Sequence, residues 1–311
     1  MVEDEKIKTT VSPFAMKEGE IKNFDGKDGY VSINQIIHRM NIGHITEIHF
    51  KILELVNEFE FMTSRQIYQM LLYKNADIKS QDKLNNKLEQ LVKTKILTRY
   101  YFSNEDGKCI YRVYCLEKMG KYLLNSRNIE CKWQPTDNTK PVSMMKKRLA
   151  GNQIILAYLR KVQAFDSYTV KPALTAKVAG KVFKANAGVK LSKGNVSIDF
   201  IFEAVRREDD WQSRLVDRMK LYQDFYENFV PFDSGYERIP QLIIVAEDSK
   251  HMVEIFKEIV TNKIEIKNIK LYFTDDLSQN ATTLDKSLIE FATDPATGKY
   301  RMNNVEVKLL G

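Results

Sequence analysis

The chain has 311 residues, of which 43% are hydrophobic, and its 48 lysines and arginines against 41 acidic residues give a net charge of +7. This composition excludes collagen-like, disulfide-scaffold and wholly disordered chains and suffices for two compact domains. No run approaches the roughly 18 apolar residues of a membrane helix, and the N-terminus shows no apolar signal segment. Cys109, Cys115 and Cys131 lack CxxC spacing, which favours reduced thiols. We therefore expect a cytoplasmic protein with no membrane partner.

Basic residues are concentrated in one part of the chain. Residues 140–194 contain twelve lysines and arginines and a single acidic residue, Asp166, so this stretch alone has a net charge of +11. The whole chain has only +7, which makes the remainder net acidic. Such asymmetry indicates a polyanionic partner, and nucleic acid is the commonest one in the cytosol. Lysines that merely keep two strands and a helix in solution are the alternative.

Residues 1–43 show little periodicity and many charges of both signs. This range predicts a flexible arm with little structure of its own, which could order on a partner.

Three short helices are then predicted within 44–125. Apolar residues recur at helical spacing over 46–59, and Thr63 with Gln66 forms the pattern of a capping box that starts a second helix.

Ser80 can cap a third helix with one apolar stripe. That stripe consists of Leu84, Leu88, Leu91 and Val92. β-Branched and aromatic runs at 96–102 and 110–116 then flank an Asp-Gly turn, which predicts a β-hairpin, and a closing helix is expected over 117–125. Three helices followed by a hairpin is the order of a winged helix-turn-helix domain.

Residues 126–142 are rich in turn formers and predict a linker. The elements expected over 143–311 follow the order helix, three strands, helix, strand, helix, strand. Alternation along 196–205 and the apolar run 242–246 are the clearest strand signals. This order favours a mixed sheet flanked by helices. The expected fold class is thus α+β, with an N-terminal winged helix-turn-helix and a C-terminal mixed-sheet α/β domain.

In winged helices the third helix enters the major groove and the hairpin contacts the DNA backbone or the minor groove. Polar residues opposite the leucine stripe recur at helical spacing and are expected to project outward together, although a solvated helix shows the same pattern. Asn and Gln can bind adenine, and Lys can reach guanine or phosphate. The residues expected to contact DNA from this helix, the hairpin and the basic stretch are Lys79, Lys83, Asn86, Lys87, Gln90, Lys108, Arg112, Lys146, Lys147, Arg148, Lys181 and Lys184.

The second domain carries a pattern seen in a known family. The strand sequence FEAVR at 202–206 precedes the helix sequence RMKLY at 218–222. Together with the preceding winged helix and linker, these segments resemble the replication-relaxation proteins over residues 46–246. The resemblance implies a plasmid or conjugative-element DNA-binding protein whose C-terminal half is similar to a PD-(D/E)XK nuclease core, with a role at an origin of replication or transfer.

Nuclease activity of that type needs carboxylates that hold Mg²⁺ and a lysine beside the scissile phosphate. The candidates are Asp199, Glu203 and Lys220. Four residues on one strand separate the two carboxylates by about 13 Å, which is too far to chelate one ion unless the strand bulges. The Glu-x-Lys triplet is missing because Val205 stands two residues after Glu203. We therefore expect a pseudo-nuclease domain without a metal site, in which the plain role of Glu203 and Lys220 is an ion pair.

These observations leave three functions open. The first is sequence-specific binding of double-stranded DNA by a plasmid, phage or conjugative-element protein, in replication initiation or its regulation, without catalysis or a cofactor. The second is a metal-dependent endonuclease that uses Mg²⁺ and is targeted by the winged helix. The third is a transcriptional repressor. Repeated binding sites imply a homodimer, and host replication or transfer proteins are further candidate partners at the nucleoid or plasmid.

Overall fold

A computed structural model describes residues 11–104, 111–280, 283–293 and 300–310. The internal contacts divide the chain into two compact units. Unit 1 consists of residues 1–16 and 153–311, and unit 2 consists of residues 17–152. The division falls within helix α6 (Val142–Lys161).

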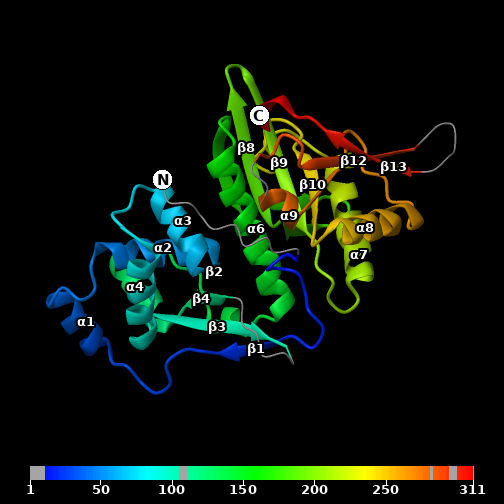
Figure 1. Cartoon of the computed structure of the whole chain (residues 1–311). Helices are drawn as coiled ribbons and strands as arrows, with labels where there is room; N and C mark the ends of the chain where they lie inside the picture. Colours follow the sequence, from blue (N-terminus) through cyan, green and yellow to red (C-terminus); the bar gives the residue numbers. More distant parts are fainter. Residues whose placement is uncertain (1–10, 105–110, 281–282, 294–299, 311) are drawn as a thin grey trace. The chain divides into compact units, whose positions relative to one another are not determined.

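Unit 2 has the element order of a winged helix-turn-helix domain (Figure 1). Before α6 its elements are β1 (Ile21–Phe24), α1 (Ile33–Asn41), α2 (Glu47–Phe59), β2 (Met62–Thr63), α3 (Ser64–Tyr73), α4 (Gln81–Lys93), β3 (Leu97–Ser103), β4 (Arg112–Leu116), α5 (Lys118–Ser126) and the 3-10 helix η1 (Pro135–Thr139). The capping box at the start of α3 is confirmed: Gln66 N–H donates to Thr63 Oγ1 and Thr63 N–H donates to Gln66 Oε1, both at 3.2 Å. The predicted Asp-Gly turn between β3 and β4 lies outside the described residues.

The range in which the sequence predicted an arm contains two elements. Strand β1 pairs antiparallel with β3 and extends the sheet to the order β1-β3-β4-β2. The ring of Phe24 packs edge-on against Tyr100 at 5.9 Å, which gives this short edge strand an apolar anchor. Helix α1 begins with a capping box in which Gln35 N–H donates to Ser32 Oγ at 3.3 Å. A four-residue strand and a nine-residue helix are too short to stand out by periodicity alone.

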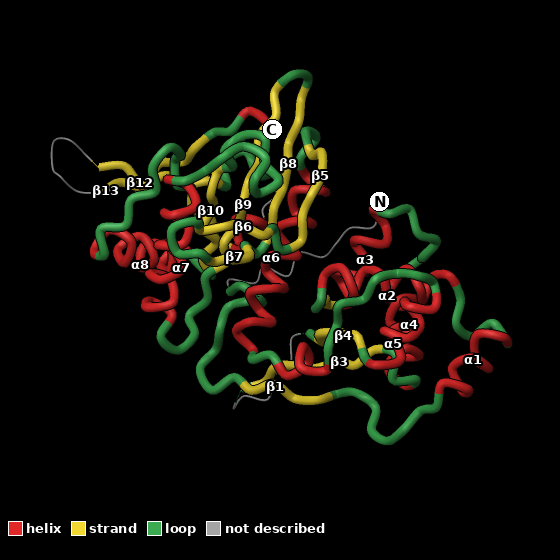
Figure 2. The backbone as a smooth tube through the Cα atoms, turned by 180° about the vertical axis from the view of Figure 1, so that it is seen from behind, coloured by secondary structure: helices red, strands yellow, loops and turns green. Residues whose placement is uncertain are grey.

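Unit 1 is built on a seven-stranded mixed sheet in the order β13-β12-β11-β10-β9-β8-β5. Strands β9, β10 and β11 are parallel and the other pairs are antiparallel, so the predicted α+β class with a mixed sheet is confirmed. The elements after α6 are β5 (Phe165–Val170), β6 (Ala173–Ala176), β7 (Lys181–Lys184), β8 (Ala187–Lys193), β9 (Val196–Ala204), α7 (Trp211–Glu227), β10 (Gln241–Ala246), α8 (Ser249–Thr261), β11 (Tyr272–Asp275), α9 (Asp276–Asn280), β12 (Leu288–Thr293), β13 (Tyr300–Val305) and the 3-10 helix η2 (Lys308–Leu310). Figure 2 shows β5 and β13 at the two edges of the sheet.

Successive side chains of β9 point to opposite faces of the sheet. Ile201 and Val205 belong to a buried apolar cluster with residues of α7 and α8. Phe202, from the opposite face, packs against Tyr158 of α6 with ring centroids 5.2 Å apart. Helices therefore cover both faces, as expected for a sheet whose central strands are almost wholly apolar.

Charged groups are buried where β9 and β10 end. Arg206 is fully buried, and its guanidinium donates to Asp276 Oδ1 at 2.9 Å and to the carbonyl oxygen of Val205 at 2.7 Å. Ser12 Oγ also donates to Asp276, and the backbone N–H of Met16 donates to Glu247 Oε1 at 2.9 Å. Residues 12–16 are thus part of the fold of unit 1, because they add hydrogen bonds to two buried carboxylates that Arg206 and Arg207 also bind.

His251 of α8 belongs to the same region and is fully buried. Its Nδ1 accepts a hydrogen bond from the backbone N–H of Glu247 at 3.3 Å, and the ring packs edge-on against Trp211. Burial, together with the positive charges of Arg207 and Arg206, lowers the pKa of His251 to about 3, although Asp248 acts in the opposite direction.

This depressed pKa predicts a pH-dependent stability of unit 1. Below the ordinary histidine value of 6.5 the unfolded chain binds a proton that the folded protein does not bind until about pH 3. The contribution of neutral His251 to the free energy of unfolding is therefore complete above pH 6.5. Below pH 6.5 it falls by about 1.4 kcal/mol per pH unit. Urea unfolding should show a loss of about 2–3 kcal/mol from pH 6.5 to 4.5 that His251→Gln lacks. Identical pH dependence in both proteins would contradict this role.

Candidate nucleic-acid interface

Helix α4 presents two chemically different faces. The side chain of Ser80 caps its first turn by accepting a hydrogen bond from Lys83 N–H at 3.3 Å. The predicted apolar stripe is buried against unit 2, with exposed fractions of 0% for Leu84 and Leu88, 1% for Leu91 and 3% for Val92. Since this stripe fixes the rotation of the helix, the residues on the opposite side point away from the core of unit 2.

The five residues predicted to contact DNA from this part of the chain all reach the surface. Lys79, Lys83, Asn86 and Gln90 are exposed, and Lys87 is half-buried. Gln90 is oriented by unit 2 itself: its Oε1 lies 3.1 Å from His49 Nε2. His49 Nδ1 accepts the backbone N–H of Thr46 at 3.0 Å, which leaves Nε2 as the donor to Gln90. Burial lowers the pKa of His49, so the neutral ring is favoured.

Helix α4 carries two acidic side chains, Asp82 and Glu89. Glu89 of α4 forms ion pairs with Arg99 of β3 and, at 3.6 Å, with Lys93. Both pairs draw the carboxylate towards cations of unit 2. Asp82, in the first turn, is exposed, so the outward side of α4 combines lysines and amides with one carboxylate.

The hairpin of the winged helix contributes less than predicted. Lys108 lies outside the described residues. Arg112 is exposed, but its Nε forms an ion pair of 2.6 Å with Asp25, which also pairs with Arg99. Asp25 follows β1, in the range where an arm was expected, so the sequence pattern of the hairpin alone could not show that Arg112 has a nearby anion.

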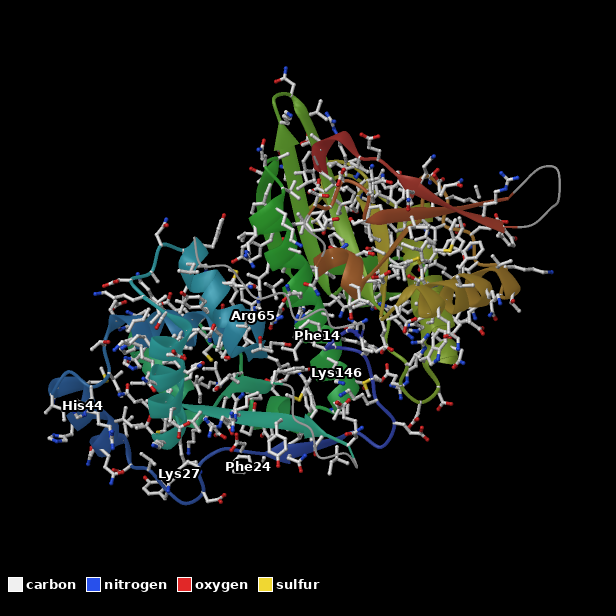
Figure 3. All side chains as sticks on the ribbon, viewed as in Figure 1. Phe14, Phe24, Lys27, His44, Arg65 and Lys146 are labelled. Carbon is white, nitrogen blue, oxygen red and sulfur yellow. The ribbon has the colours of Figure 1, made fainter. Side chains whose placement is uncertain are left out.

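Two predicted contacts in the basic stretch are wrong. Lys146 (Figure 3) is 1% exposed and forms an ion pair with Glu20, and Arg148 is 4% exposed. Arg148 Nε donates to Asn152 Oδ1 at 3.0 Å, and burial lowers the pKa of Arg148 to about 10. This part of α6 is buried on several sides. A charge count along the sequence therefore could not show that the side chains of Lys146 and Arg148 point into the protein. Lys147 is half-buried, whereas Lys181 and Lys184 are exposed on β7.

The three residues considered for nuclease chemistry do not converge. Glu203 is 9% exposed, and its Oε2 accepts hydrogen bonds from Tyr222 Oη at 2.7 Å and from Arg218 Nη2 at 2.9 Å. Lys220 is exposed, so the expected Glu203–Lys220 ion pair is wrong and Arg218 is the partner. Two helical positions rotate the side chain by about 200°, which turns Lys220 to solvent once Arg218 faces the sheet.

Asp199 lies apart from Glu203 on the same strand. It lines a cavity together with Lys190 and residues 232–238, whereas Glu203 faces α7. Among the described residues no group of three or more His, Cys, Asp or Glu side chains is placed to hold a metal ion. Within the same part of the chain, no helix is both long and apolar enough to cross a membrane.

No protein-family model and no curated protein matches the chain. Among solved structures, the restriction endonuclease FokI is similar over 74% of this chain and 42% of its own, with 10% sequence identity and a TM-score of 0.27. The chain thus spans less than half the length of FokI, and a TM-score of this size does not establish a shared fold.

Proposed function

We propose that unit 2 binds double-stranded DNA through the outward face of α4. The observation that carries this proposal is the division of α4 into a buried leucine stripe and an opposite side with Lys83, Asn86, Lys87 and Gln90 beside one carboxylate, Asp82; Lys79 lies just before the helix. In a winged helix-turn-helix domain this helix is the one that enters the major groove. Ammonium groups suit phosphates and guanine, and amides suit adenine, so this face has the chemistry that duplex DNA requires.

The biological setting is a second part of the proposal. The residue patterns at 202–206 and 218–222, following a winged helix, support a replication-relaxation protein of a plasmid, phage or conjugative element. Such a protein would act in replication initiation or its regulation, on the nucleoid or plasmid. A homodimer would read two half-sites, because one winged helix covers only a short sequence, and host replication or transfer proteins would be its further partners.

Unit 1 is proposed to support DNA binding without cleaving DNA. Arg218 and Tyr222 both bind Oε2 of the Glu203 carboxylate, an arrangement that stabilises the strand-helix packing. The exposed lysines of β7, Lys181 and Lys184, could contribute phosphate contacts. Contacts to phosphates do not depend on the base sequence. These two lysines would therefore increase the affinity for DNA without adding sequence specificity.

Incubation with the supercoiled plasmid or element that encodes the chain separates binding from cleavage. We expect the full-length protein to retard this DNA in a gel, and the DNA to stay supercoiled in the presence of Mg²⁺ or Mn²⁺. Nicking by the wild type that disappears in Glu203→Ala would establish the endonuclease alternative instead. Absence of any retardation at low salt, where phosphate contacts are strongest, would remove the DNA-binding proposal.

A further inference from the structure

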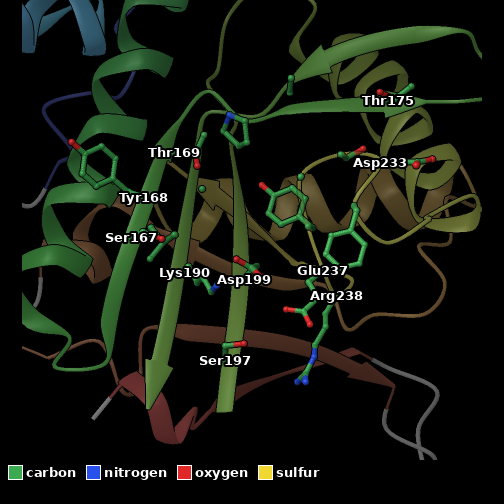
Figure 4. Close-up of a pocket in the computed structure, with 18 residues that line it drawn as sticks. Ser167, Tyr168, Thr169, Thr175, Lys190, Ser197, Asp199, Asp233, Glu237 and Arg238 are labelled. Atoms are coloured by element: carbon green, nitrogen blue, oxygen red, sulfur yellow. The ribbon is translucent and has the colours of Figure 1, made fainter. Parts of the chain in front are cut away.

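Unit 1 contains a cavity that the proposed duplex contacts do not use. Its volume is 610 Å³. One wall is the sheet surface formed by β5, β8 and β9, and the other is the loop of residues 232–238 between α7 and β10 (Figure 4). A space of this size is typical of small-ligand sites.

Two opposite charges lie side by side on the sheet wall. Lys190 of β8 and Asp199 of β9 are directly opposite each other in the antiparallel register, so both side chains lie on the same face of the sheet. Burial raises the pKa of Asp199, and the charges of Asp166 and Glu237 raise it further while Lys190 lowers it. No hydrogen bond or ion pair from another described residue reaches the Asp199 carboxylate. A half-buried carboxylate in this state is available to a ligand.

The loop wall holds aromatic and cationic groups towards the same space. Phe232 is 72% exposed and has a φ of 70°, a left-handed conformation that is costly for a bulky residue. The loop keeps it there through a hydrogen bond of 2.6 Å from Phe232 N–H to the carbonyl oxygen of Tyr236. Arg238 is exposed at the end of the loop and also lines the cavity.

Gly188 of β8 also lines the cavity. A methyl group at that position would lie 3.3 Å from Pro172 Cγ and 3.6 Å from Tyr236 Oη. The Tyr236 hydroxyl therefore lies next to the glycine, and burial raises the pKa of Tyr236, with a further contribution from the charge of Asp199. A methyl group at Gly188 would be in ordinary contact with the Tyr236 hydroxyl and tight only against Pro172.

We propose that this cavity binds a guanine base. An ionised carboxylate offers two acceptor oxygens, and the Watson–Crick edge of guanine offers two adjacent N–H donors, N1–H and the N2 amino group. The guanine O6 next to them accepts hydrogen bonds, which suits the ammonium group of Lys190. The exposed ring of Phe232 would stack on the base, and Arg238 would bind an attached phosphate.

The other bases match this pair of side chains less well. Adenine, cytosine and thymine each present a single N–H-bearing group on that edge, so one carboxylate oxygen of Asp199 would stay without a donor. An acceptor that is partly withdrawn from water and left without a donor lowers the affinity for these bases. In duplex DNA the same edge is occupied by base pairing, so the ligand is a free guanine nucleotide or an unpaired guanine in a DNA strand.

Calorimetry on the full-length protein tests this site independently of α4. We expect GMP to bind at least tenfold more tightly than AMP or CMP, and Asp199→Asn and Lys190→Met each to reduce GMP binding at least tenfold. Asp217→Asn, at an exposed position of α7, is the matched control and should bind GMP like the wild type. The Lys83→Ala/Lys87→Ala variant should also bind GMP normally, so a failure of the duplex proposal would leave this one standing.

Single-stranded oligonucleotides distinguish the two sources of guanine. If the base comes from DNA, a thymine oligonucleotide with one central guanine should bind more tightly than the all-thymine strand, and Asp199→Asn should abolish the difference. GMP selectivity without this difference identifies the free nucleotide as the ligand. The proposal is overturned if neither probe is preferred over its guanine-free counterpart, or if folded Asp199→Asn and Lys190→Met proteins keep the preference.

Discussion

Replacing Lys83 and Lys87 of α4 together by alanine is expected to weaken duplex-DNA binding by roughly 10- to 100-fold at about 0.1 M salt. Each lysine that neutralises a phosphate releases a counterion, so its loss lowers the salt dependence as well as the affinity. If the wild type contacts roughly six phosphates, its log affinity falls with log salt at a slope of about −5. The double variant should reduce this slope by up to about two. Fluorescence anisotropy over a salt series measures both quantities.

The control for this experiment removes two positive charges from a different helix. Lys250 and Lys257 are exposed on α8 of unit 1, and their replacement by alanine should leave the slope nearly unchanged. A separate change, Asn86→Ala, should weaken binding by about 1–3 kcal/mol at one base position only. Equal slopes for the wild type and the Lys83/Lys87 variant would show that α4 does not contact phosphates.

The Glu203→Ala variant is expected to destabilise unit 1 by about 2–4 kcal/mol. Arg218 would lose its anion and the buried Tyr222 hydroxyl its acceptor, and both partners would remain in a largely dry environment. The Arg218 side chain is 21% exposed, so water compensates part of the loss and the effect stays below that of a fully buried pair. Urea denaturation of the two proteins gives the difference.

Two further variants identify the cause of that loss. Lys220→Ala should change the stability by less than about 0.5 kcal/mol, because its side chain is exposed. Glu203→Gln keeps an acceptor for Tyr222 and should fall between the wild type and Glu203→Ala. If Glu203→Ala is as stable as the wild type, the carboxylate has no structural role, and a functional one would have to be sought.

Long amphipathic patterns made much of unit 2 predictable from the sequence. The leucine stripe of α4 and the Thr63–Gln66 capping box are local signals, and local signals survive folding when they agree with the packing. Helix α1 was missed because nine residues are too few to stand out by periodicity, and β1 because its pairing depends on distant segments. Phe24 against Tyr100 and the ion pair of Asp25 with Arg112 join residues far apart in the chain.

The direction of charged side chains was the least predictable property. Charge density along residues 140–194 indicated one cationic surface, yet Lys146 and Arg148 are buried. Likewise, the partner of Glu203 is Arg218 rather than Lys220, because helix rotation is set by the apolar residues of α7 that face the sheet. Long cationic side chains can be buried when a carboxylate or an amide receives them, and sequence spacing does not show which ones are.

The cavity of unit 1 was missed for a different reason. Asp199 was considered only as a metal ligand together with Glu203, whereas its neighbours in space are Lys190 and residues 232–238. The loop comes from beyond α7, so proximity to it follows only from the tertiary fold. Its one local signal was the turn-forming sequence around Gly235.

Photocrosslinking from α4 tests the central claim most directly. A photoreactive amino acid introduced at Asn86 lies on the proposed DNA face, and the same residue introduced at Tyr122, which is exposed on α5, provides the control within unit 2. With labelled duplex from the element that encodes the chain, we expect a covalent DNA adduct from position 86 and little from position 122. Equal yields at the two positions, or an adduct from position 122 alone, would contradict DNA binding through α4.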